Sequence, residues 1–183
     1  VSYPSASDTD FNFTRKLIEE DLVPDDVAIQ ILIPAKKEWI KKSVEAMKNV
    51  KNGIFHLYNP TNEFQRRVVF QKSDDEIIQM AIEAMQYLVE LTKDFKGKVT
   101  YQYSPESFSQ TTLEFAVKIC NKVINVVKPT VENKMIINLP NTLEACMPNV
   151  YADRIEWMCK NLHNREALII SVHPHNDRGT SVA

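Results

Sequence analysis

Glycine is scarce in this sequence. Only three glycines occur among 183 residues, and neither the GxGxxG nor the GxxxxGK pattern is present. Both patterns depend on glycines that let a nucleotide phosphate approach the backbone closely. The classes of nucleotide-binding protein that use such loops are therefore set aside.

Cysteine is equally scarce. The three cysteines are Cys120, Cys146 and Cys159, and no pair has CxxC spacing. This odd set supports neither a disulfide scaffold nor a thiolate zinc site. A reducing compartment fits best, either the bacterial cytoplasm or an organelle matrix, and we do not expect secretion.

Long apolar runs and an excess of one charge are also lacking. No run approaches the roughly 20 residues that span a bilayer, and the first residues do not form a basic and then apolar leader. The formal charge is −2 and the pI is about 6.1, so we expect neither nucleic acid nor membrane as a partner. An apolar content of 44% with 25% charged residues is typical of one globular domain or part of one.

Short β-branched runs alternate with longer segments of helical period, which predicts repeated β–α units. The six predicted strands are residues 1–3, 27–33, 53–58, 99–104, 135–139 and 167–173. The five predicted helices lie between them, at about 10–20, 34–49, 73–95, 111–127 and 149–161.

Polar residues recur at the carboxyl end of nearly every predicted strand. This recurrence is typical of a (β/α)₈ TIM barrel, whereas a doubly wound sheet gathers its ligand contacts at one switch point. Six parallel strands with five intervening helices are two strands short of a barrel, which usually needs about 250 residues. We therefore expect an α/β fold, an incomplete TIM barrel in which 1–183 is an internal part of a single catalytic domain, with the first and last strands missing.

The strongest local motif is the HPHNDRG segment that begins at His173. Residues two apart on an extended chain point the same way, so His173 and His175 present two imidazoles to one point. The pair predicts a divalent metal site, with zinc, manganese, iron, cobalt or magnesium as the ion. The alternative is that one histidine caps the strand and the other is solvated. Residues 176–179 would orient the imidazole rings or form a solvated loop.

Two further candidates end predicted strands. His56 lies in the run FHLYN, where a substrate contact and a buried core position are equally compatible with the pattern. Glu106 follows Ser104 and a proline, so its carboxylate suits proton transfer, or it caps the next helix. Arg66 and Arg67 are expected on a solvated helix face.

Several blocks together resemble the 2-isopropylmalate synthase family in its longer fungal and actinobacterial form. They are HLYNPTNEFQRRVVF from residue 56, YSPESFSQTTLEFA from residue 103, INLPNTLEACMPNVYADRIEWM from residue 137 and HPHNDRGTSVA from residue 173. The resemblance covers essentially the whole chain. The wider superfamily of metal-dependent acyl-CoA condensing and cleaving barrels shares the SPES and HPHNDRG blocks in part.

The resemblance implies a role for each candidate. His173 and His175 match metal-ligand positions, His56, Ser104 and Thr142 match contacts to the 2-oxo acid, and Glu106 matches a catalytic carboxylate beside the substrate. The implied reaction is a Claisen-type condensation of acetyl-CoA, the co-substrate, with 2-oxoisovalerate, dependent on a divalent cation such as Mg, Mn or Zn. The product is 2-isopropylmalate, the first committed intermediate of leucine synthesis, and the implied full-length enzyme is a homodimer.

The sequence also departs from the family pattern. Asn141 stands where the family usually has a small residue, Gln110 where it often has glycine, and Cys146-Met147 where a Ser/Thr pair is more usual. The family's Arg, a metal-binding Asp, an Asn ligand and a leucine-sensing region are expected outside these residues, so we expect the 183-residue piece alone to be inactive. A homocitrate- or citramalate-type synthase and a non-catalytic metal-binding barrel remain as alternatives.

Overall fold

The computed structural model describes residues 3–183 and contains alternating strands and helices. The α-helices are α1 (Asp8–Glu19), α2 (Lys37–Ala46), α3 (Asp74–Thr92), α4 (Leu113–Val127) and α5 (Pro148–Asn161). The strands are β1 (Ile29–Pro34), β2 (Asn52–Pro60), β3 (Lys98–Glu106), β4 (Met135–Asn141) and β5 (Leu168–Pro174). Three short helical turns, η1 (Gln65–Val69), η2 (Phe108–Gln110) and η3 (Arg165–Ala167), complete the pattern.

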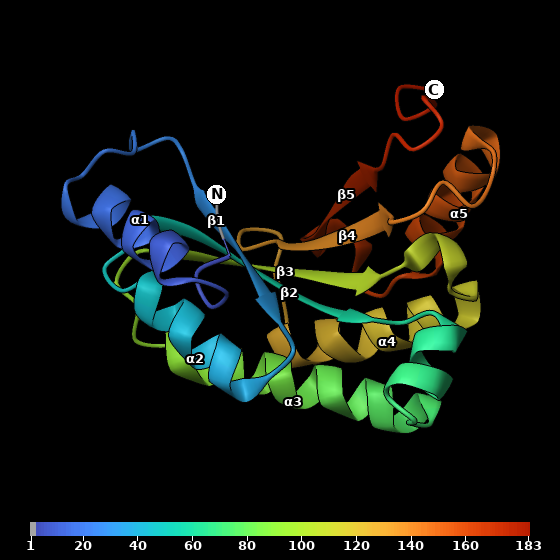
Figure 1. Ribbon diagram of the computed structural model, residues 1–183, viewed down its shortest axis with the longest axis horizontal. Helices are drawn as coiled ribbons and strands as arrows, with labels where there is room; N and C mark the ends of the chain where they lie inside the picture. The colour runs from blue at the N-terminus through green and yellow to red at the C-terminus, as the bar shows by residue number, and fades with distance from the viewer. Residues whose placement is uncertain (1–2) are drawn as a thin grey trace.

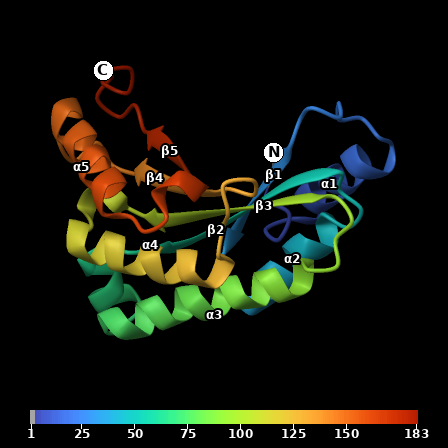
Figure 2. The same ribbon diagram turned by 180° about the vertical axis from the view of Figure 1, so that it is seen from behind.

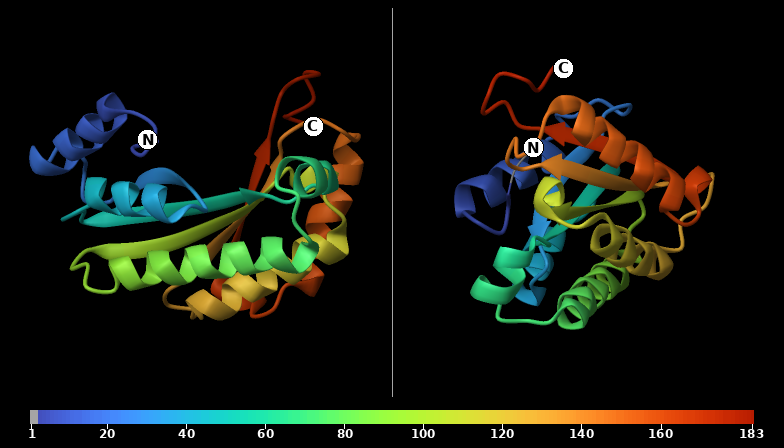
Figure 3. Two further views of the ribbon diagram at one scale, coloured as in Figure 1. Left: turned by 60° about the horizontal axis from the view of Figure 1, so that its bottom comes forward. Right: turned by 90° about the vertical axis from the view of Figure 1, so that its right-hand side faces the viewer.

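The strands form one parallel sheet that is wound in a single direction. Its order is β1-β2-β3-β4-β5, so each strand pairs with its neighbours in the chain. Helices α2, α3 and α4 lie along the same face of the sheet, as the two opposite views show (Figures 1 and 2). A doubly wound sheet would reverse its strand order and carry helices on both faces. The winding is therefore that of a β/α barrel, and Figure 3 shows the sheet curving.

Strand β1 separates an apolar face from a more polar one. In β1, Ile29, Ile31 and Ile33 are buried, whereas the alternate residues Gln30 and Leu32 are only half-buried. Side chains alternate across a strand, so the isoleucines face the helices and Gln30 faces the concave side. The hydrophobic core thus fills the space between sheet and helices, and the polar side chains of the strands lie on the opposite face.

The cap chemistry of α3 matches its predicted start. Ser73 precedes the helix and accepts a hydrogen bond from the Glu76 backbone N–H, while the Glu76 carboxylate accepts one from the Ser73 backbone. This reciprocal pair is the capping box that the Ser-Asp-Asp-Glu spacing predicts. None of the helices described between residues 3 and 183 is long and apolar enough to cross a membrane.

The strands and helices predicted between residues 10 and 173 are confirmed, with ends shifted by a few residues. The predicted first strand, residues 1–3, falls mostly outside the described residues, which begin at Tyr3. Tyr3 itself lies in no strand. Tyr3 instead begins a turn, in which its carbonyl accepts from the Ala6 N–H, and its ring contacts Trp39. The described sheet therefore has five strands rather than six.

The prediction of a solvated Arg66 is wrong. Arg66 lies in η1, a π-helical turn after β2, and is only 6% exposed. Its guanidinium sits 4.0 Å from the centre of the Phe115 ring and pairs with Asp74. The stack and the ion pair bury a charge that helical periodicity alone places in solvent.

We expect the shortening of a side chain to cost more folding stability on the helix-covered face of the sheet than on the opposite face. Replacing Ile31, which is 0% exposed, by alanine leaves a cavity between sheet and helices. We expect Ile31→Ala to lower the free energy of unfolding by about 2 to 5 kcal/mol in urea denaturation followed by circular dichroism. The control Ile169→Ala, at a side chain that is 47% exposed, should cost about 1 kcal/mol. Equal costs would contradict the assignment of the core to the helix-covered side.

Candidate active site

A cavity of about 200 Å³ opens at the carboxyl ends of the strands. It gathers all the site residues predicted from the sequence, and its lining is His56, Ser104, Glu106, Thr142, His173, His175, Leu32, Tyr58, Asn138 and Pro140. The carboxyl end is where barrels of this type build their active sites. His163, by contrast, lies in the exposed turn after α5 and is not part of the cavity.

A row of hydrogen-bonded side chains crosses the sheet beneath this cavity. Gln30 on β1 contacts His56 on β2, with 3.2 Å between Gln30 Nε2 and His56 Nδ1. His56 Nε2 lies 2.6 Å from Ser104 Oγ on β3, and Asn138 Nδ2 on β4 donates to the same oxygen at 2.7 Å. Ser171 Oγ on β5 then donates to Asn138 Oδ1 at 2.9 Å. One polar side chain from each strand thus belongs to a single network.

The geometry of this row assigns the protons. Because the amide nitrogen of Gln30 donates to Nδ1, the neutral His56 ring carries its proton on Nε2 and donates to Ser104. Ser104 Oγ also accepts from Asn138, so both of its lone pairs are used. The hydroxyl hydrogen of Ser104 is left to donate to a molecule in the cavity.

His56 is held neutral at physiological pH. Burial, and to a smaller extent the neighbouring His173, lower its pKa to about 4. The side chain is 7% exposed. A buried imidazole whose two nitrogens are both engaged in side-chain hydrogen bonds favours the uncharged form.

The turn that carries Glu106 is fixed by the neighbouring strands. The Glu106 carbonyl accepts from the backbone N–H and from the hydroxyl of Thr61, at 3.0 and 2.9 Å. Ser107 follows with a φ of 60°, and its N–H donates to Thr142 Oγ1 at 3.1 Å. Burial raises the pKa of the Glu106 carboxyl, which suits it to holding and releasing a proton.

His173 and His175 lie together at the end of β5, as their spacing predicts. Their ring centres are 5.1 Å apart and both rings line the cavity. Burial and the neighbouring His175 lower the pKa of His173, which favours the neutral imidazole that binds metals. Within residues 3–183, no group of three or more His, Cys, Asp or Glu side chains is arranged to hold a metal ion. The pair fits two positions of a divalent coordination shell.

Residues 176–178 do not point their hydrogen bonds at the imidazole rings. Asn176 accepts from Ser181, Asp177 accepts from the backbone N–H of Glu144, and Arg178 donates to Glu144 and to the carbonyl of Cys146. These bonds connect the loop after His175 to the loop after β4. The structure therefore gives these residues a role in holding the loop.

Sequence reasoning did not assign several residues of the cavity wall to the site. The hydroxyl of Tyr58 lies 3.1 Å from that of Tyr3, which fixes the Tyr58 ring at the cavity edge. Burial and this hydrogen bond raise the pKa of Tyr3. Leu32 and Pro140 form the apolar part of the wall. The available signal was strand alternation, because these positions share the inward face with His56 and Asn138.

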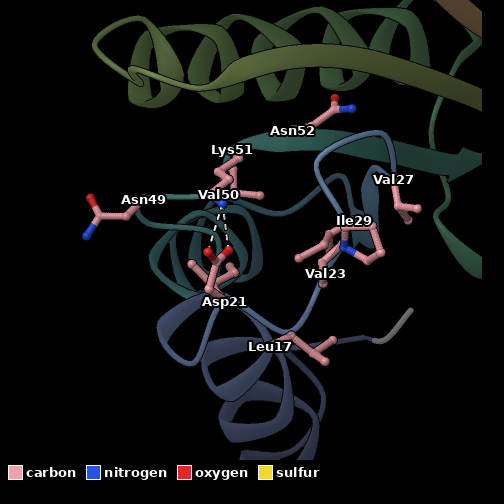
Figure 4. Close-up of a pocket in the computed structure, with 11 residues that line it drawn as sticks. Leu17, Asp21, Val23, Val27, Ile29, Asn49, Val50, Lys51 and Asn52 are labelled. Atoms are coloured by element: carbon pink, nitrogen blue, oxygen red, sulfur yellow. Dashed lines mark hydrogen bonds and ion pairs between the residues drawn. The ribbon is translucent and has the colours of Figure 1, made fainter.

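A second cavity, of about 110 Å³, lies at the opposite end of the strands (Figure 4). Its wall includes Leu17, Val23, Ile29 and Val50, close to the starts of β1 and β2. Its cationic group, Lys51, is paired with Asp21 and Asp25. The amino ends of barrel strands serve stability, and we assign this cavity no chemistry.

The winding of the sheet and the cavity at the carboxyl ends of its strands are those of the β/α-barrel class, and the comparison with known proteins gives the family. The family model HMGL-like matches residues 1–183, and the chain belongs to this family.

Curated relatives narrow the similarity further. The chain is 52% identical over 186 residues to the 2-isopropylmalate synthase of Clostridium acetobutylicum, 52% over 183 residues to that of Rhizobium johnstonii and 53% over 183 residues to that of Brucella suis. Each comparison covers 100% of this chain and 33% of the relative. The chain thus spans about one third of the length of the curated relatives that it matches.

The lowered pKa of His56 predicts that the folded state loses stability in acid. Between pH 6.5 and about 4 the unfolded histidine binds a proton that the folded one rejects, so stability falls as the pH drops through this window. The expected loss is roughly 3 kcal/mol, and it is complete below the folded pKa. Unfolding free energies of metal-free wild type and His56→Gln at pH 7, 5.5 and 4.5 measure it. The variant should lose this share of the pH dependence, and parallel curves for the two proteins would contradict the account.

Proposed function

We propose that the protein of which this chain is part is a 2-isopropylmalate synthase. The reaction removes a methyl proton from acetyl-CoA and joins that carbon to the ketone carbon of 2-oxoisovalerate, whose oxygen becomes an alcohol. Water then hydrolyses the thioester to give 2-isopropylmalate and CoA. The observation that carries the proposal is the single cavity in which His56, Ser104, Glu106, Thr142 and the histidine pair meet. Identity above 50% to three bacterial 2-isopropylmalate synthases supports it.

His173 and His175 are the residues that would hold the metal. Neutral imidazoles suit Zn, Mn, Fe or Co, and Mg remains compatible where oxygen atoms complete the shell. When bound, the cation acts as a Lewis acid that polarises the ketone of the 2-oxo acid. The two histidines leave positions in the shell for the further ligands expected outside this chain, and for the water and substrate oxygens that catalytic sites admit.

The polar side chains of the cavity bind and orient the 2-oxo acid. Ser104 has a hydroxyl hydrogen available, and Thr142 likewise keeps one because its oxygen accepts from Ser107. Both hydroxyls suit the carboxylate of the substrate. His56, held neutral, adds no charge and keeps Ser104 in its donating orientation.

Glu106 is suited to proton transfer. Its backbone is fixed by Thr61 and its carboxyl pKa is raised by burial, so the group takes up and returns protons closer to neutral pH than an exposed glutamate. Matching the pKa of an acid or base to the working pH is the requirement of general catalysis. We assign Glu106 to proton transfer between acetyl-CoA, water and the product.

The apolar wall favours a branched substrate over the alternatives. Leu32, Pro140 and the ring of Tyr58 offer contact to an isopropyl group. Pyruvate is smaller and would leave part of the wall unfilled, at a cost of about 1 to 3 kcal/mol in specificity.

We also propose a cellular compartment and an oligomeric state for the full-length protein. Its bacterial relatives and its unpaired cysteines favour a reducing compartment, the bacterial cytoplasm or an organelle matrix. A homodimer is the assembly that we propose for the full-length enzyme.

Glu106→Gln tests the chemical role. In the full-length protein the amide keeps the shape of the side chain but cannot accept a proton, so kcat should fall about 10²- to 10⁴-fold. The KM for 2-oxoisovalerate should change little, because Glu106 is assigned to the proton and not to substrate binding. Release of the CoA thiol measures both constants. Glu83→Gln, an exposed change on α3, is the matched control. An unchanged kcat in Glu106→Gln would remove the carboxyl from the mechanism.

Substrate profiling and chelation separate the alternatives. The full-length protein should turn over 2-oxoisovalerate faster than 2-oxoglutarate or pyruvate. Its activity should be lost after EDTA treatment and should return when Mg, Mn or Zn is added. Preference for another acid would indicate a homocitrate- or citramalate-type synthase. Metal binding without any CoA release would indicate a non-catalytic barrel.

A further inference from the structure

Glu144 is a buried carboxylate that the proposed reaction does not use. It lies in the loop after β4, two positions beyond Thr142 of the cavity wall, and is only 7% exposed. A charged group with so little contact with water is costly unless it is well hydrogen-bonded. Its partners therefore indicate what the charge is for.

The partners of the Glu144 carboxylate all lie in the loop that follows His175. Its Oε1 accepts from the backbone N–H of Thr180 at 3.3 Å and from the Thr180 hydroxyl at 2.5 Å, and its Oε2 accepts from the backbone N–H of Arg178. These hydrogen bonds, led by that of the Thr180 hydroxyl, lower the pKa of Glu144 and keep it ionised. Charge-assisted bonds of this kind are about twice as strong as neutral ones.

Further bonds join the same two loops on both sides of the carboxylate. The His175 N–H donates to the carbonyl of Asn141 at 3.4 Å, and the Glu144 N–H donates to Asp177 Oδ2 at 3.3 Å. The Arg178 guanidinium donates to the carbonyl of Cys146 at 2.7 Å. The loop turns sharply at Gly179, which lies between Arg178 and Thr180 and has a φ of 76°. The Glu144 carboxylate lies among these bonds and itself accepts from three donors, the backbone N–H groups of Arg178 and Thr180 and the Thr180 hydroxyl.

We infer that Glu144 is a positioning residue for the histidine pair. It anchors the segment directly after His175, so the direction in which the backbone leaves β5, and with it the aim of the His175 ring beside His173, depends on this carboxylate. A group that orients a metal ligand without touching the metal changes metal affinity about 10- to 100-fold when it is lost. The inference rests on the metal site of the proposed function.

Glu144→Gln in the full-length protein tests the inference. The amide keeps one acceptor oxygen but turns an NH₂ group toward a donor, so the anchor breaks while the size is preserved. We expect calorimetric titration of the metal-free protein with Mn²⁺ or Zn²⁺ to give affinity about 10- to 100-fold weaker than wild type. Amide hydrogen exchange at Arg178 and Thr180 should speed up before any metal is added. Glu156→Gln removes the same charge from the exposed face of α5 and should bind like wild type.

Thr180→Val gives a second, milder test, because it removes the hydroxyl donor and keeps the backbone bond. It should weaken metal binding in the same direction by a smaller factor, and it decides the question if Glu144→Gln does not fold. Wild-type metal affinity in Thr180→Val and in folded Glu144→Gln would overturn the inference. Loss of metal affinity in these variants of a protein that shows no condensation would instead support Glu144 and refute the proposed reaction.

Discussion

The hydrogen-bonded row from Gln30 through His56, Ser104 and Asn138 to Ser171 is the constraint on which the site depends. Each strand contributes one member, so the bonds form only when all the strands keep their register. A slip of one residue would turn each polar side chain toward the apolar helix face, where it would be buried without a partner. The row therefore selects the same register as the core on the other side of the sheet.

The proposed chemistry depends on where this row lies. It forms the floor of the cavity, below the residues that end the strands, and it determines which atoms face a substrate. Gln30 sets the proton of His56, His56 and Asn138 occupy the lone pairs of Ser104, and the serine hydroxyl is left as a donor. Groups held in this way need little rearrangement when a substrate enters.

Much of this could be predicted from the sequence, because strands and helices have their own periodicities and because polar residues at strand ends meet in a barrel. His56, Glu106, His173 and His175 were predicted by that logic and Ser104 and Thr142 by the family resemblance, and the structure brings all six together. The hydrogen-bonded row depends on inter-strand register, which no single segment encodes. Arg66 is buried because its guanidinium stacks on Phe115, which is distant in the chain, and pairs with Asp74 at the start of the next helix. The anchoring of residues 176–181 by Glu144 is likewise a contact between two loops.

A crystal structure of the full-length protein with Zn²⁺ and 2-oxoisovalerate tests the central claim most directly. The account predicts an anomalous peak about 2.1 Å from one nitrogen each of His173 and His175, with the substrate carboxylate within hydrogen-bonding distance of Ser104 Oγ. An anomalous peak away from the histidine pair, or a substrate carboxylate that does not contact Ser104, would contradict it.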